Sequence, residues 1–137
     1  MQRAQRRSTG ETLLAFKLTG DEWEALRAHR ADIELADGCA CGSLRRLHTG
    51  YKTFVHERDS GCSWTDREDH ESESPEHETG KVVIERACGR AGWAAEVESP
   101  GPPIEPGSRT RKWWADVLAS KGQVRIAFEV QWMYTAT

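Results

Sequence analysis

The sequence predicts an α+β protein in which a small N-terminal cysteine- and histidine-containing element precedes a core of one helix and three strands. The stretch 75–91 has helix-start and helix-stop residues at its ends and apolar residues at helical spacing. The stretches 93–98 and 113–132 alternate apolar and polar residues, as half-buried strands do. We therefore divide the 137 residues into a strand and helix (1–36), a cysteine- and histidine-containing element with an acidic loop (37–74) and the core (75–137).

Charge is distributed unevenly along the chain. Residues 57–78 hold nine acidic and two basic residues, a net of −7, so the remainder carries −3 minus −7, or +4. The total charge therefore gives no support for DNA binding, and a nucleic acid would have to meet the basic remainder. The sequence has no apolar run of bilayer length, and its basic start lacks the apolar segment of a secretory signal. We expect a cytoplasmic protein whose four cysteines are thiols or metal ligands.

The first half of the chain predicts several short elements. Residues 1–10 look like a loose basic arm, and 12–18 read as a strand. Thr19 and Glu22 form a capping box at the start of a helix over 21–30. Residues 44–47 and 51–56 predict two strands around a turn at Thr49 and Gly50. Residues 63–74 are polar and predict a loop.

The helix over 75–91 is the clearest element. Ser74 is a good N-cap, Pro75 suits the first helical position, and Gly92 suits the C-terminal stop. The expected core stripe consists of Ile84, Ala87, Cys88 and Ala91, so Cys88 is read as a core residue. Residues 99–109 contain four of the five prolines and predict a loop.

The last two strands predict a hairpin that turns at Lys121 and Gly122. In that register Asp116 faces Ala127 and shares a face of the sheet with Glu129 and Gln131. The apolar residues of the second strand then point into the core: Val124, Ile126, Phe128 and Val130. Asp116 and Glu129 become diagonal neighbours, roughly 7–8 Å apart, which two side chains can close onto one cation.

Two carboxylates and an amide suit a hard metal ion, since Mg²⁺ takes carboxylate oxygens and substrate phosphate. Such residues are also common on the solvent face of an amphipathic hairpin, and the hairpin alone favours that plainer reading over a metal site. Extending the helix stripe backwards adds Lys81 and His77, with Glu76 one step round, at a helix end that favours anions. The plainer alternatives are a capping or core histidine at 77 and a snorkelling lysine at 81.

These motifs resemble the competence-protein CoiA-like nucleases, whose core is similar to the PD-(D/E)xK restriction-endonuclease fold. The shared pattern is Glu-His, three residues, Lys on a helix, then Asp before a turn, then Glu-x-Gln on the next strand, and it covers about 75–132. The corresponding residues are Glu76, His77, Lys81, Asp116, Glu129 and Gln131. The resemblance implies a hydrolase that cuts DNA phosphodiesters, as an endonuclease or exonuclease, during DNA processing or uptake.

The same resemblance implies roles for individual residues. Asp116 and Glu129 would bind Mg²⁺ or Mn²⁺, Glu76 would complete the metal shell, and Gln131 would stand where relatives carry a catalytic lysine. The resemblance also implies a small cysteine/histidine element before the core. Cys39, Cys41, His56 and Cys62 fit that place, and three thiolates with an imidazole would form a structural zinc site. Because Cys-x-Cys is tighter than the usual spacing, four unligated side chains are an equal alternative, with His48 and His70 as further ligand candidates.

The sequence departs from the family pattern at two points. The family continues with a further helix and strand after the Glu-x-Gln strand, whereas this sequence stops at Thr137. We expect an incomplete core whose open sheet edge would need a protein partner or an oligomer. Gly80 inside the helix is also unfavourable, by about 1 kcal/mol relative to Ala. The alternative function is a catalytically inactive nucleic-acid or protein-binding module with a structural zinc element.

Overall fold

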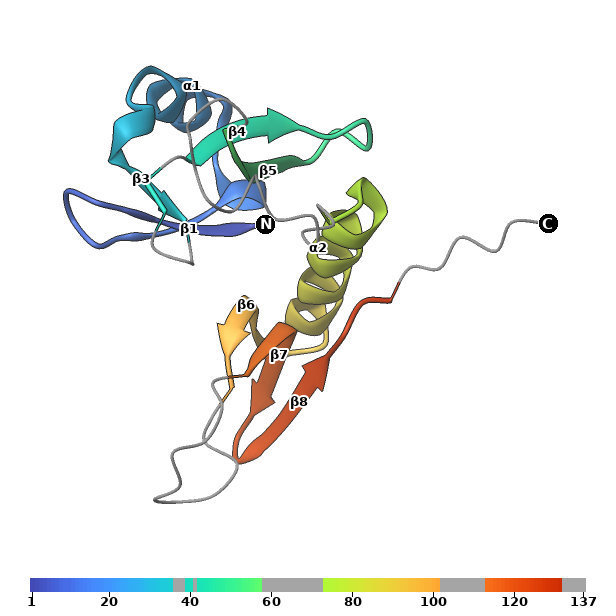
Figure 1. Ribbon diagram of the computed structural model, residues 1–137. Helices are drawn as coiled ribbons and strands as arrows, with labels where there is room; N and C mark the ends of the chain where they lie inside the picture. Colours follow the sequence, from blue (N-terminus) through green and yellow to red (C-terminus); the bar gives the residue numbers. More distant parts are fainter. Residues whose placement is uncertain (36–38, 41, 58–72, 102–112, 132–137) are drawn as a thin grey trace. The chain divides into compact units, whose positions relative to one another are not determined.

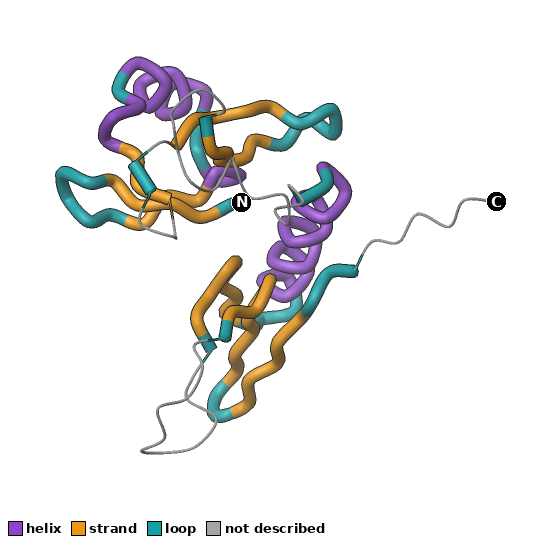
Figure 2. Tube along the Cα trace, in the orientation of Figure 1, coloured by secondary structure: helices purple, strands orange, loops and turns teal. Residues whose placement is uncertain are grey.

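The computed structural model describes residues 1–35, 39–40, 42–57, 73–101 and 113–131. It is an α+β protein with small antiparallel sheets, and it divides into two compact units, Met1–Glu78 and Thr79–Thr137 (Figures 1 and 2). The boundary between the units lies inside the second helix. The predicted α+β class is therefore confirmed. No helix among the described residues is long and apolar enough to cross a bilayer.

The N-terminal unit contains a three-stranded sheet in the order β2-β1-β3 and a hairpin of β4 and β5. The strands are β1 (Arg3–Arg6), β2 (Thr12–Leu14), β3 (Ile33–Leu35), β4 (Gly42–Arg46) and β5 (Lys52–His56). The helical segments are α1 (Gly20–Ala28) and the short 3-10 turns η1 (Ala15–Lys17) and η2 (Arg30–Asp32).

The core of this unit is an apolar cluster formed by the strands, α1 and η1. Ala4 of β1 pairs with Leu13 on one side and with Leu35 on the other, and all three side chains are buried. Phe54 of β5 and Leu26 of α1 complete the cluster, so the hairpin and the helix share one core with the sheet. Burial of Phe54 is total, which makes it the largest apolar contribution to this core.

Two predictions for the first 35 residues are corrected by the structure. Residues 1–10 are not a loose arm, because β1 is the central strand of its sheet. No apolar alternation in the sequence indicates this strand, because the buried side chains of this segment are Gln2 and Ala4 and their neighbours are Arg3, Gln5 and Arg6. The predicted strand over 12–18 ends at Leu14, where the chain enters η1. The short strand β3 was not predicted.

The predicted capping box and hairpin are confirmed. The Glu22 amide donates to Thr19 Oγ1 over 3.2 Å, and the Thr19 amide donates to Glu22 Oε2 over 2.8 Å. These bonds satisfy two of the free amides at the start of α1. The β4–β5 turn includes Gly50 with φ +88°, a backbone conformation that glycine adopts readily.

The C-terminal unit contains a three-stranded antiparallel sheet in the order β6-β7-β8. It is preceded by α2 (Pro75–Arg90), and its strands are β6 (Ala94–Pro100), β7 (Trp114–Lys121) and β8 (Val124–Phe128). The His77 amide donates to Ser74 Oγ over 3.1 Å at the helix start. At the helix end Gly92 has φ +79°, and the Trp93 amide donates to the Cys88 carbonyl over 2.9 Å. The predicted start and stop signals are thus confirmed, and the stop is a Schellman motif.

The buried face of α2 differs from the predicted stripe. Lys81 and Val82 are fully buried, whereas Ala87 and Ala91 are exposed and Cys88 is half-buried. Gly80 belongs to the face of α2 that meets the chain after β8, because a Cβ atom at Gly80 would lie 2.8 Å from Val130 Cγ1. The glycine that weakens the helix therefore lets the chain after β8 approach the helix closely.

The hairpin forms as predicted, but its register is shifted. Lys121 pairs with Val124, so the turn residues are Gly122 and Gln123, and Gly122 has φ +59°. Val124 and Ile126, which we expected in the core, are 55% and 40% exposed. The reason is that β8 lies at the edge of the sheet, whereas Ala115, Val117 and Ala119 on the central strand are buried.

Candidate functional site

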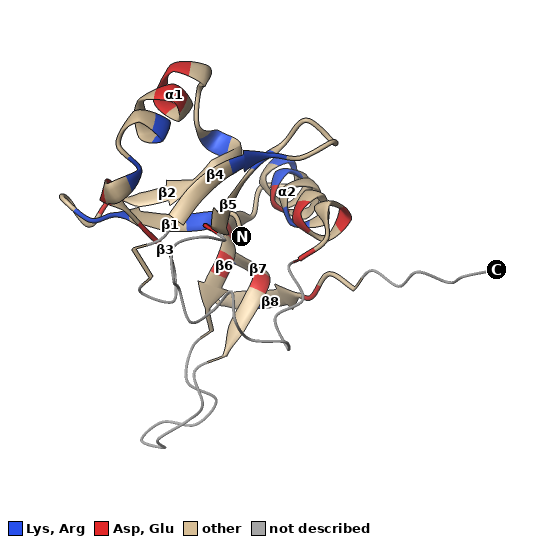
Figure 3. Cartoon of the chain, turned by 45° about the horizontal axis from the view of Figure 1, so that its top comes forward, with Lys and Arg blue, Asp and Glu red and all other residues tan. Residues whose placement is uncertain are grey.

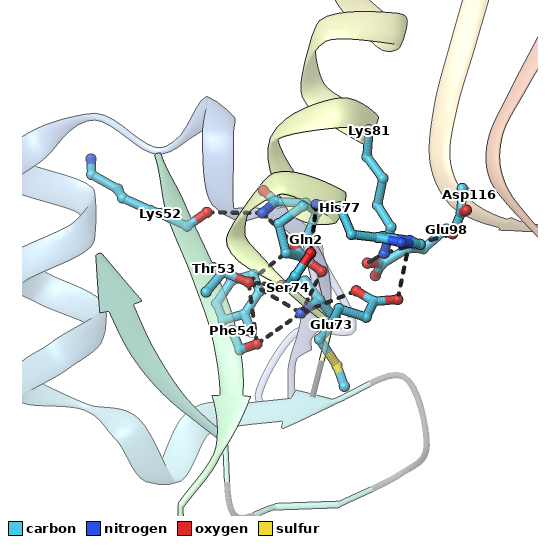
Figure 4. A network of polar contacts seen from close by, with 12 residues as sticks. Gln2, Lys52, Thr53, Phe54, Glu73, Ser74, His77, Lys81, Glu98 and Asp116 are labelled. Atoms are coloured by element: carbon cyan, nitrogen blue, oxygen red, sulfur yellow. Dashed lines mark hydrogen bonds and ion pairs between the residues drawn. The ribbon is translucent and has the colours of Figure 1, made fainter. Parts of the chain in front are cut away.

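Lys81 is the most unusual side chain of the C-terminal unit. It projects from α2 and is fully buried, yet it carries an ammonium group. Its Nζ lies 2.9 Å from Glu98 Oε1 and 3.7 Å from Asp116 Oδ1 (Figure 4). A buried charge is tolerated only where opposite charges and hydrogen bonds compensate its lost hydration. The two carboxylates supply that compensation, and with Lys81 they form what we call the carboxylate–lysine cluster (Lys81, Glu98, Asp116).

Glu98 was missed by sequence reasoning. It lies on β6, where Val97 pairs with Val117 and Ser99 pairs with Ala115, so Glu98 stands opposite Asp116. Acidic residues therefore lie on both β6 and β7 (Figure 3). In the sequence, the alternation of residues 93–98 indicates a strand. It does not identify the cross-strand partner of Glu98, because that partner depends on the length of the loop between the two strands.

The backbone at Glu98 is also unusual. Its φ of +50° is the one positive value at a non-glycine residue among those that the structure describes. The left-handed region costs a residue with a Cβ atom about 1–2 kcal/mol, and such backbone strain is found preferentially at functional sites. The short bond between Glu98 and Lys81 offsets this cost and fixes the direction of the carboxylate.

Asp116 uses its two oxygens for different partners. Oδ1 lies toward Lys81, while Oδ2 accepts a 2.7 Å hydrogen bond from the Val130 amide. The carboxylate therefore joins the helix to the chain that follows β8. Asp116 was predicted as a site residue, and the structure places it in the cluster with Lys81.

Glu129 and Gln131 follow the end of β8 and are both exposed. The last observed pair of the ladder is Val117 with Phe128. The next pair in this register would be Asp116 and Glu129, directly opposite each other, about 4.5–5.5 Å apart between Cα atoms. The predicted pairing of Asp116 with Ala127 is therefore wrong by two residues. In the corrected register Asp116 and Glu129 would still share one face of the sheet, and they would stand directly opposite each other.

Glu76 and His77 occupy the first turn of α2 and belong to the N-terminal unit. Glu76 Oε1 lies 3.5 Å from Nε2 of His48, and His77 Nε2 lies 3.7 Å from Glu73 Oε1. Within this unit the sequence also failed to single out Glu78, which is buried. Its carboxylate accepts from Gln2 Nε2 over 2.7 Å and from Thr53 Oγ1 over 3.1 Å.

The proposed zinc ligands are only partly described. Cys41, Cys62 and the further candidate His70 lie outside the described residues. Cys39 is partly buried and packs against the apolar core of the N-terminal unit, and His56 ends β5. The tetrahedral zinc arrangement therefore stays a prediction.

Hard-metal ligands are present in both units. Glu73, His77 and Glu78 in the first unit, and Asp116 in the second, are carboxylate and imidazole groups that could hold a metal ion. Carboxylate oxygens such as those of Glu98 and Asp116 fit Mg²⁺ or Mn²⁺ better than a soft metal. The two carboxylates already share one cation, the ammonium of Lys81.

Comparisons with known proteins give no further identification. No protein-family model matches the chain, and neither curated proteins nor solved structures give a significant match.

Proposed function

We propose that the chain is a nuclease that uses a divalent metal ion to hydrolyse DNA phosphodiesters, with its site at the carboxylate–lysine cluster. The observation that carries the proposal is the fully buried Lys81 held between carboxylates from two paired strands. Such a buried charged group beside acids, with a strained residue among them, is more typical of a functional site than of a stabilising core. The resemblance to the CoiA-like nucleases and to the restriction-endonuclease core supports the same reading.

In this proposal Asp116 and Glu129 hold Mg²⁺ or Mn²⁺, and Glu98 is an additional ligand candidate. A bound metal ion of this kind polarises the phosphorus centre, stabilises the leaving oxygen and lowers the pKa of a bound water. The chain's own residues provide the rest: Lys81 balances the acidic charge, and Gln131 orients water or phosphate by hydrogen bonding. By the resemblance, Glu76 is the helix acid and His77 the histidine of the same pattern; both lie at the start of α2, in the N-terminal unit.

The wider parts of the proposal concern partners and location. DNA phosphates would meet basic residues such as Arg125 on β8, which is exposed. Arg109, Arg111 and Lys112 are further candidates and lie outside the described residues. A cytoplasmic site of action and a structural zinc ion at Cys39, Cys41, His56 and Cys62 complete the proposal.

The second candidate function is a catalytically inactive nucleic-acid or protein-binding module. It is favoured by the ammonium of Lys81, which already neutralises part of the acidic charge that a metal ion would need. Gln131 in place of a catalytic lysine favours it as well. In this alternative the cluster would only hold α2 on the sheet.

A DNA nicking assay separates the two functions. Supercoiled plasmid is incubated with Mg²⁺ or Mn²⁺, and with a chelator as the metal-free reference. We expect metal-dependent nicking that falls at least about a hundredfold in Asp116→Asn, because even outer-shell residues of metal sites cost about 10–100-fold. Glu98→Gln tests the newly found acid, and its matched control is Glu96→Gln, an exposed acid on the same strand.

Two results would contradict the nuclease proposal. If nicking is unchanged in Asp116→Asn, the activity comes from another site or a contaminant. If the wild-type chain binds DNA without cutting it under any of these metal conditions, the binding module is the better reading. Equal losses in Glu98→Gln and Glu96→Gln would remove Glu98 from the site.

A further inference from the structure

The outer edge of the C-terminal sheet carries apolar side chains that the described residues of its own unit leave exposed. Val124 and Ile126 of β8 are 55% and 40% exposed. They lie on the same face as Val117 and Ala119 of β7, which are buried. Among the described strands β8 pairs with β7 alone. An apolar strand at a sheet edge is a template for pairing with a further strand.

The hydrogen-bonding groups of β8 divide into two sets. Lys121 and Val124 flank a two-residue turn, so they form a hydrogen-bonded pair, and such pairs recur at every second residue. Val124, Ile126 and Phe128 therefore direct their amides and carbonyls toward β7. The Val130 amide, which donates to Asp116 Oδ2 on β7, follows the same alternation. Arg125 and Ala127 then present their backbone groups at the outer edge.

The sequence of this edge is complementary to itself. In one antiparallel register Ala127 of two copies stand opposite each other, and Arg125 of each copy stands opposite Glu129 of the other. The same register places Ile126 opposite Phe128 within β8, and Val124 opposite Val130, which like Glu129 follows the end of that strand and would have to extend it. Apolar residues then meet on one face and opposite charges meet on the other, and each kind of pair stabilises a sheet.

The neighbouring registers are worse. A shift of four residues places the two Arg125 side chains opposite each other, and like charges in direct opposition are destabilising. A shift of two residues sets Arg125 opposite Ala127, so the pairing of Arg125 with Glu129 is lost. A shift of one brings the wrong backbone groups together and turns the apolar side chains to opposite faces.

We propose that the partner of β8 is a second copy of this chain, joined edge to edge in the Arg125–Glu129 register. The pairing is isologous, so one interface forms a closed dimer rather than a filament. It extends the three-stranded sheet of each copy into a continuous sheet across the two-fold axis. The proposal concerns association: in the dimer Glu129 and Arg125 lie in the interface and take no part in metal or DNA binding, so a metal ion at the cluster would be held by Asp116 and Glu98.

Charge reversal tests this register directly by sedimentation equilibrium of the full chain. We expect the wild type to dimerise reversibly with rising concentration. Arg125→Glu and Glu129→Arg should each weaken self-association by about tenfold, because two attractive cross-strand pairs become repulsive. Mixing the two variants should restore association, since every pair in the mixed dimer is again of opposite charge. Arg46→Glu, at an exposed position of β4, is the matched control.

Ala127→Pro gives an independent test of backbone pairing. It removes an amide that faces outward and leaves the bonds to β7 in place, as proline on edge strands does. We expect this variant to be monomeric with an unchanged circular dichroism spectrum. A wild type that stays monomeric at high protein concentration would overturn the proposal. So would a dimer that neither charge reversal weakens, or one that the mixture fails to restore.

Discussion

The two units of the chain use their apolar residues in opposite ways. Apart from Trp23, the N-terminal unit buries its large apolar side chains in one cluster around Phe54, Leu26 and Ile33. In the C-terminal unit the buried apolar residues are mostly small, and a lysine is buried with them. Among the described residues, the large apolar side chains that are exposed all lie in this second unit: Val83, Trp114, Val124 and Ile126.

This difference bears on how strongly the residues of each unit stabilise it. A buried ion pair is weak support for stability, because lost hydration cancels much of the attraction between the charges. Exposed apolar residues likewise add little to folding, and a contiguous exposed patch of them is typical of a binding surface. The N-terminal unit is thus built for packing, whereas the C-terminal unit places charge inside and apolar surface outside.

The largest effect should come from the apolar core. Phe54→Ala should destabilise the N-terminal unit by about 3–5 kcal/mol, because it removes a fully buried ring and leaves a cavity. Val83→Ala in the other unit should cost less than about 0.5 kcal/mol, since Val83 is 51% exposed. Amide hydrogen exchange measures each unit separately. Similar losses for both variants would remove the contrast between the units.

The second effect concerns the buried charge. Lys81→Met should destabilise the C-terminal unit by about 3–5 kcal/mol, because Glu98 and Asp116 lose the cation between them. Added Mg²⁺ should recover part of this loss if the carboxylates can share a metal ion. Lys17→Met, at an exposed position, is the control. A stable Lys81→Met variant would show that the cluster is not held together by charge.

A smaller effect is expected at the start of α1. Thr19→Ala should cost about 1 kcal/mol, because the side-chain acceptor for the Glu22 amide is lost. Denaturation monitored by hydrogen exchange in the N-terminal unit checks this value. Glu24→Ala, an exposed change in the same helix, should be close to neutral. Equal effects of the two changes would show that the capping box does not stabilise the unit.

The smallest effect is electrostatic. The Ser8 hydroxyl and amide both donate to Asp32 over 2.8 Å, and the hydroxyl bond is the main cause that lowers the pKa of Asp32. Because the pKa of Asp32 is lowered in the folded state, the stabilisation that these bonds provide is present above the unfolded pKa. It is lost as pH falls through the folded pKa. Ser8→Ala should raise the pKa of Asp32, which NMR titration measures. An unchanged pKa would show that these bonds are not kept in solution.

Parts of the fold with local signals could be predicted from sequence. The capping box at Thr19, the N-cap Ser74 and the stop at Gly92 depend on neighbours within a few residues, and the structure confirms each. The strand β1 could not be predicted, because its pairing with β3 joins residues far apart in the sequence and Ala4 is its one apolar residue. Tertiary context decided that segment rather than local propensity.

The candidate site shows the same limit. Lys81 and Asp116 were identified by motif spacing, and the structure brings them together. Glu98 was not, because its position opposite Asp116 depends on the register across residues 101–113. The hairpin register was wrong by two residues because Gly122 occupies the first turn position instead of the second. A single glycine in a turn is compatible with either placement.

Metal binding tests the central claim most directly. Mn²⁺ is titrated into the full chain by calorimetry, and its paramagnetic broadening of NMR signals locates the ion. We expect a saturable binding event that broadens the signals of Asp116 and of Glu98 or Glu129, is lost in Asp116→Asn and is kept in Asp21→Asn, an exposed acid of α1. No binding to the wild type, or equal binding to both variants, would contradict it.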